Sequence, residues 1–66
     1  MKVWINGEVY VIESGMTIKQ LLVVNCLDNK RVAVELNKEI VPRSQHETHY
    51  LRAGDLVEIV HAIGGG

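Results

Sequence analysis

Two hairpin signals with one helix signal between them constrain the fold of this chain more than any other feature. The first is Asn6-Gly7, which separates the β-rich arms "KVWI" and "EVYVI". A type I′ turn needs positive φ at both central residues, and Asn-Gly adopts it readily. The second is Asn37-Lys38, which follows the alternating run "RVAVEL" and precedes a brief second arm. We therefore expect two hairpins on either side of one helix.

The helix signal begins at Thr17, which stands three positions before Gln20 in the spacing of a capping box. The apolar stripe that would face a core consists of Ile18, Leu21 and Leu22. This stripe does not continue cleanly past the next turn, so we expect the helix to end near Asn25.

The remainder of the chain supplies one loop and one strand. Pro42 ends the second hairpin, and the polar, aperiodic stretch "PRSQHETHYL" indicates a loop or a single helical turn. A turn at "RAGD" then precedes the strand "LVEIVHAI". The order ββαββ(loop)β predicts an α+β fold in which a mixed sheet curls around the helix. The closing strand would run parallel to the first, as in ubiquitin-like β-grasp domains.

Alternation divides the strands into two faces. Val3 and Ile5 share one face of the first strand, and Val32, Val34 and Leu36 share one face of a later strand. In the closing strand Val57 and Ile59 are expected to face the helix, whereas the faces of residues 9–12 are not assigned by the pattern. The opposite face of the closing strand carries Leu56, Glu58, Val60 and Ala62. An apolar patch on so small a domain is a candidate docking surface.

Composition excludes several classes of function. A chain of 66 residues is one domain with a small core, which disfavours an enzyme acting alone. Seven basic and eight acidic residues are spread without a run, and one Trp and two Tyr are too few for a nucleic-acid surface. Met1 opens into "KVWING" without a signal-peptide pattern, and no apolar run approaches a membrane span. We expect a cytoplasmic protein that binds neither nucleic acid nor membrane.

The side chains that could carry chemistry do not form a recognisable site. His46 and His49 are three residues apart, but two ligands do not make a metal centre, and we interpret both as solvated loop residues. His61 is expected at the sheet margin. Cys26 has no partner for a disulfide and no histidine placed beside it by the sequence, so we expect it to pack at the helix end.

The chain ends in Gly64, Gly65 and Gly66, which offer a different chemistry. Without Cβ atoms, these residues could extend through a channel too narrow for side chains. A partner holding Mg-ATP could then convert the terminal carboxylate to an acyl adenylate, which a sulfur or amine nucleophile would attack. The alternative is an idle, frayed end.

The element order and the tail together resemble the ThiS family of sulfur carrier proteins of thiamine biosynthesis. The segments that carry this resemblance are "INGE", "TIKQLL", "RVAVELNKEIVPRS" and "LRAGDLVEIVHAIGGG". The resemblance implies a β-grasp fold in residues 1–66 with a flexible tail at 64–66. It also implies that the Gly66 carboxylate is adenylated and becomes a thiocarboxylate, which donates sulfur to thiazole synthase for the thiazole ring.

The resemblance further implies the partners. A ubiquitin-activating-like adenylyltransferase would use ATP-Mg, a sulfur donor enzyme would feed the reaction, and the chain itself would bind no cofactor or metal. A carrier of this kind needs no catalytic side chain, and we expect it to be a monomer when free.

Three other functions remain open at this stage. The chain could carry sulfur in another pathway, as the small subunit of molybdopterin synthase does, or it could be a ubiquitin-like modifier whose Gly66 is joined to lysines. It could also be a passive interaction domain with an idle tail, in which case removal of the glycines would change nothing.

Overall fold

The structure is a computed structural model that describes residues 1–28 and 30–61. Five strands, one α-helix and one 3₁₀ turn succeed one another along the chain. Their bounds are β1 Lys2–Ile5, β2 Glu8–Val11, α1 Ile18–Val24, β3 Val32–Leu36, β4 Glu39–Val41, η1 Arg43–Gln45 and β5 Leu56–His61. This order confirms the predicted succession of two hairpins, a helix between them and a closing strand.

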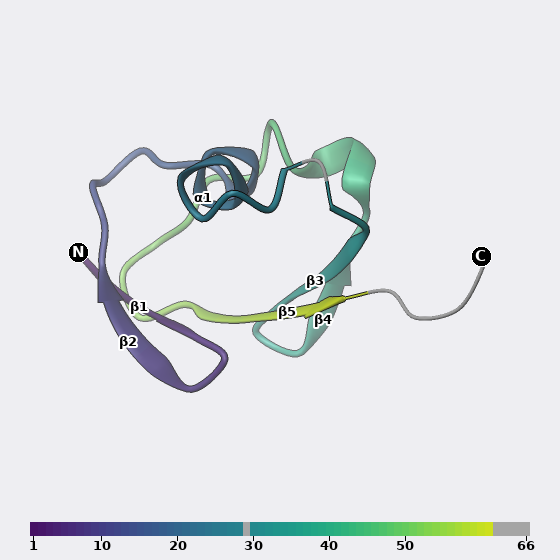
Figure 1. Cartoon of the computed structure of the whole chain (residues 1–66). Coiled ribbons are helices and arrows are strands. Elements are labelled where there is room, and N and C mark those ends of the chain that lie inside the picture. Colours follow the sequence, from purple (N-terminus) through teal and green to yellow (C-terminus); the bar gives the residue numbers. More distant parts are fainter. Residues whose placement is uncertain (29, 62–66) are drawn as a thin grey trace.

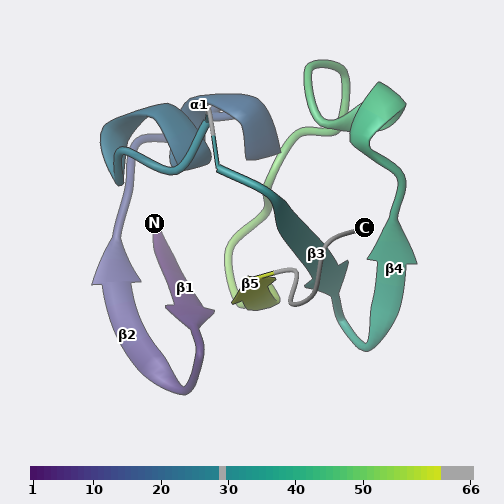
Figure 2. The same ribbon diagram turned by 45° about the vertical axis from the view of Figure 1, so that its right-hand side comes forward.

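The strands form one sheet in the order β2-β1-β5-β3-β4. Strand β5 pairs parallel to β1 and antiparallel to β3, so it joins the two hairpins. Helix α1 lies across one side of the sheet (Figure 1), and the two hairpins lie on either side of β5 (Figure 2). The predicted mixed sheet with a parallel closing strand is confirmed.

Left-handed residues close both hairpins. Asn6 has φ 50° and Gly7 has φ 85° in the first turn, and Asn37 has φ 51° and Lys38 has φ 71° in the second. Asparagine adopts this region more often than most residues other than glycine. The Asn-Gly and Asn-Lys dipeptides therefore fix the two turns as predicted.

Helix α1 begins with the predicted capping box. The amide of Gln20 donates to Thr17 Oγ1 at 3.2 Å, and the amide of Thr17 donates to Gln20 Oε1 at 2.9 Å. The helix ends at Val24 and is capped by Asn25, whose side-chain amide donates to the carbonyl of Leu21 at 2.8 Å. Both ends agree with the sequence prediction.

The core lies between the inner face of the sheet and α1. Its buried members are Val3, Ile5, Ile18, Leu21, Leu22, Val34, Leu36, Val41, Leu51, Val57 and Ile59. The inward face predicted for β5 is thus confirmed, and the shared faces predicted for β1 and β3 are the ones that turn inward, with Val32 half-buried at the margin. Strand β2 is exposed along its whole length, and its register places Val9 beside Trp4 on the outer face.

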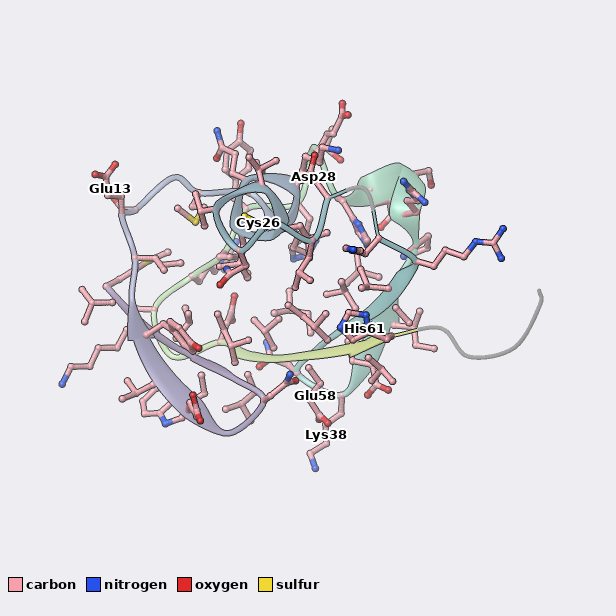
Figure 3. All side chains as sticks on the ribbon, viewed as in Figure 1. Glu13, Cys26, Asp28, Lys38, Glu58 and His61 are labelled. Atoms are coloured by element: carbon pink, nitrogen blue, oxygen red, sulfur yellow. The ribbon has the colours of Figure 1, made fainter. Side chains whose placement is uncertain are left out.

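The prediction that Cys26 packs at the helix end is wrong. Cys26 is exposed and has φ 60°. It occupies the left-handed position just after the helix. Its amide donates to the carbonyl of Val23 at 3.0 Å, and the amide of Leu27 donates to the carbonyl of Leu22 at 2.8 Å. With this backbone geometry the Cys26 side chain, labelled in Figure 3, is exposed at the end of α1.

The prediction that His46 is solvated is also wrong. Only 4% of His46 is exposed, and its Nε2–H donates to the carbonyl of Val41 at 3.0 Å. His49 is half-buried. The carbonyls of His46 and His49 accept from the amides of Lys19 and Ile18, at 2.9 and 3.0 Å. Because the first amides of a helix have no partner within it, this loop satisfies the start of α1.

We predict that Leu21→Ala lowers the free energy of unfolding by about 2–5 kcal/mol, because it leaves a cavity in the core. Leu21 is only 1% exposed. Urea denaturation measures the change. Val11→Ala is the control, since Val11 is 77% exposed and its truncation should cost less than about 0.5 kcal/mol. Equal losses in the two variants would contradict the assigned core.

We predict that Cys26→Gly raises the free energy of unfolding by up to about 1 kcal/mol, because glycine adopts φ 60° without a Cβ clash. Cys26→Val should lower it, since a β-branched side chain is strained at positive φ. Thermal denaturation under reducing conditions compares the three proteins. A stabilising Cys26→Val would show that the left-handed cap is misassigned.

Candidate functional site

The predicted reactive tail lies outside the described residues. Ala62 and the three glycines Gly64, Gly65 and Gly66 belong to this part of the chain. The structure therefore describes the strand that leads to the tail, which is β5 as far as His61. His61 itself is exposed at the end of that strand, in the marginal position expected for it.

The outward residues of β5 lie as the alternation predicts. Leu56 is 46% exposed and Val60 is 53% exposed, whereas Val57 and Ile59 between them are buried. Glu58 is exposed and points away from α1 (Figure 3). The described part of the predicted docking face, namely Leu56, Glu58 and Val60, is thus accessible from the outer side of the sheet.

The sheet extends this face beyond β5. Trp4 pairs with Leu56 and, on its other side, with Val9, while Ile40 reaches the face from β4. We call the exposed group Trp4, Val9, Ile40, Leu56 and Val60 the outer apolar surface; its members are 37–70% exposed. Sequence reasoning placed Trp4 opposite the core side of β1 but did not identify it as part of this surface. The signal that was missing is the register between β1 and β5, which alternation within one strand does not provide.

Charged groups lie within the same face. Glu35 and Glu58 are direct neighbours across β3 and β5. Like charges in that position are unfavourable. Lys38, from the second turn, lines a shallow depression of about 470 Å³ together with Trp4, Leu56 and Glu58. The outer face therefore combines exposed apolar side chains with two neighbouring carboxylates and one nearby lysine.

The other candidate side chains do not come together. Cys26 lies at the end of α1 and His61 at the end of β5 (Figure 3). The Nε2 atom of His46 is hydrogen-bonded to the carbonyl of Val41. No group of three or more metal-ligating side chains is found in residues 1–28 and 30–61. Within the same residues, no helix has the length and apolar character that a membrane span requires.

Comparison with known proteins places the chain in a family. The model of the ThiS family matches residues 3–66. The chain is 41% identical over 64 residues to the sulfur carrier protein ThiS of Thermus thermophilus, with 97% of this chain and 98% of that one covered. It is similar in fold to the crystal structure of a thiamine biosynthesis protein (ThiS) from Geobacter metallireducens. The TM-score is 0.85 at 28% identity, and each chain is covered completely.

Longer proteins also contain a similar segment. The chain is 46% identical over 66 residues to a thiazole synthase of Paramagnetospirillum magneticum, in an alignment that covers all of this chain and 20% of that protein. It thus spans about a fifth of the length of this relative. Because the family match covers nearly the whole sequence and the fold agrees throughout, the chain belongs to the ThiS family.

Proposed function

We propose that this chain is a sulfur carrier of thiamine biosynthesis and that the α-carboxyl group of Gly66 carries the sulfur. The observation that supports this most is the family match, which runs through residue 66. Relatives that this chain covers almost end to end are named sulfur carrier proteins. The proposal requires that Gly66 has a free carboxyl group.

The proposed chemistry takes place on the tail and not on the folded domain. An α-carboxylate is ionised at neutral pH and is a poor acyl donor. A carboxylate oxygen of Gly66 attacks the α-phosphorus of ATP, and pyrophosphate leaves. Sulfide from a donor enzyme then attacks the acyl carbon of the adenylate, AMP leaves, and the thiocarboxylate remains. The thiocarboxylate gives its sulfur to thiazole synthase, which builds the thiazole ring.

In this proposal the partners supply all catalytic groups. A ubiquitin-activating-like adenylyltransferase binds ATP-Mg, and the carrier contributes recognition and reach. The tail at 64–66 enters the partner active sites. From Ile63 to Gly66, a fully extended chain spans at most about 14 Å. The similarity to a segment of a thiazole synthase supports thiazole synthase as one of these partners.

We propose that partners dock on the outer apolar surface together with Glu58, which lies between Leu56 and Val60 in β5. Ala62, the next residue of the same alternation in the sequence, belongs to this proposed docking surface. Exposed apolar groups on a small domain stabilise a complex when a partner covers them. Because this surface includes residues of β5, the strand that leads to the tail, a docked partner would also receive the tail.

We predict that thiocarboxylation replaces one oxygen of Gly66 by sulfur. The purified chain would be incubated with the adenylyltransferase, ATP-Mg and a sulfide source, and the intact mass and the mass of the terminal peptide would be measured. The mass should rise by the sulfur-for-oxygen difference, in the terminal peptide alone. An unchanged mass under these conditions would contradict the proposal and favour a passive interaction domain. An amide bond between Gly66 and a lysine would indicate a ubiquitin-like modifier.

Gly65→Val tests whether the tail must pass a narrow channel. We expect it to retain the stability of the original chain and to lose at least about 90% of the thiocarboxylation rate, because a branched side chain blocks extension through a close-fitting passage. Equal thiocarboxylation rates in Gly65→Val and the original chain would contradict the narrow channel.

A transfer assay separates the two sulfur-carrier pathways. We expect the thiocarboxylated chain to give its sulfur to thiazole synthase and not to molybdopterin synthase.

We predict that Val60→Lys weakens binding to the adenylyltransferase by about tenfold or more, because the ammonium group must lose water under a docked partner. Val24→Lys is the matched control, since Val24 is 63% exposed but lies on α1. It should change Kd by less than about twofold. Titration calorimetry measures both, and a larger effect at Val24 would move the docking surface to the helix side.

A further inference from the structure

The side chain of Asn6 is hydrogen-bonded to Ile59 of β5, which lies 53 residues further along the chain. The amide of Ile59 donates to Asn6 Oδ1 at 2.8 Å, and Asn6 Nδ2 donates to the carbonyl of Ile59 at 3.2 Å. The backbone amide of Asn6 donates to the carbonyl of Val57 at 2.9 Å. Because the ladder between β1 and β5 ends at the pair Ile5 and Val57, the Asn6 side chain continues it by one step.

Asn37 holds the other end of the same strand. The amide of Leu56 donates to Asn37 Oδ1 at 3.0 Å, and Asn37 Nδ2 donates to Asp55 Oδ1 at 3.2 Å. The backbone amide of Asn37 donates to the carbonyl of Leu56 at 2.7 Å. The first residue of each hairpin turn therefore uses a left-handed backbone and an amide side chain to hold β5, Asn37 at its start and Asn6 near its end.

The two β5 residues bonded by these asparagines, Leu56 and Ile59, are followed by different parts of the chain. Leu56 is the first residue of β5 and the rest of the strand follows it, whereas the chain beyond Ile59 leads to the tail. On the β3 side, pairing continues to Val32 and His61. On the β1 side, within the described residues, the hydrogen bonds to β5 end at Ile59. The end of β5 is thus held on one side by its pairing with β3 and on the other by the Asn6 side chain.

When a partner's channel holds the tail extended, a small change of direction at Ile59 becomes a larger displacement at the reactive group. Residues 60–66 span at most about 25 Å when extended. A tilt of about 10° at Ile59 would therefore displace a carboxyl group at the far end by up to about 4 Å. A misplacement of about 1 Å can already cost about a hundredfold in rate when a group must attack in line.

We infer that Asn6 is a positioning residue for the reaction proposed above: by fixing Ile59 against the first turn, it sets the direction in which the chain leaves a docked domain toward the partner's ATP. This inference rests on the proposed sulfur-carrier function. Asn6 also lines the depression beside Trp4 and Leu56, so the turn that holds the strand end lies next to the outer apolar surface. The first hairpin therefore contributes both to the outer apolar surface, through Trp4 and Val9, and to the hold on Ile59, through Asn6.

Asn6→Gly and Asn37→Gly form a matched pair of variants. Glycine adopts φ values near 50° without strain, so both turns persist, and each substitution removes two side-chain hydrogen bonds to β5 or the residue before it. Urea denaturation gives the stability of each variant, and rates are measured where more than about 90% of every protein is folded. The assay is ATP–pyrophosphate exchange catalysed by the adenylyltransferase with carrier as the varied substrate.

We expect Asn6→Gly to lower kcat about tenfold with KM changed by less than about twofold, because docking persists while the carboxylate is misdirected. Asn37→Gly should leave kcat within about twofold at a comparable loss of stability. Hydrogen exchange should accelerate at the Ile59 amide in Asn6→Gly and at the Leu56 amide in Asn37→Gly, since these amides lose their acceptors.

Three results would overturn the inference. An equal fall of kcat in both variants would show that Asn6 acts through stability alone, and an effect on KM alone would show that it acts through docking. Unchanged exchange at Ile59 in Asn6→Gly would show that its side chain does not hold the strand end. If the original chain supports no exchange at all, the proposed function fails together with the inference, whereas the other results leave the proposed function intact.

Discussion

The pairing of β5 with β1 on one side and β3 on the other is the interaction on which the rest of the structure depends. Each hairpin has a turn that specifies it locally, but an isolated hairpin is at best marginally stable in water. Strand β5 joins the two hairpins into one sheet, and only a sheet of that width offers α1 a continuous apolar face. The two turn asparagines add side-chain bonds where the backbone ladders leave β5 short of partners.

Local chemistry made most of this fold predictable. Asn-Gly, the Thr17 capping box and the alternation in β3 and β5 each act within a few residues, so they can be recognised without the tertiary structure. Cys26 was misplaced because its type is usually buried, whereas its left-handed position after the helix is set by backbone bonds. His46 was misplaced because nothing in a polar loop reveals that its carbonyl satisfies the amide of Lys19 at the start of α1.

The candidate site was predictable only in part for a related reason. Outward residues of β5 follow from parity, and Leu56 and Val60 are exposed as parity requires. Trp4 and Ile40 join them because of the register between strands, which the sequence of one strand does not contain. Asn6 could be recognised as a turn residue, but its bonds to Ile59 depend on a parallel pairing between segments about 50 residues apart.

The position of β5 in the sheet also has a consequence for how the protein is made. A chain that grows from its first residue contains both hairpins and the helix before the strand that belongs between them. Until β5 emerges, β1 and β3 have no common neighbour, and contacts between residues so distant in sequence form late. The outward residues of β5 take their places on the outer face of the sheet when β5 pairs with β1 and β3. An interrupted chain would therefore lack both the finished domain and the exposed face that β5 contributes.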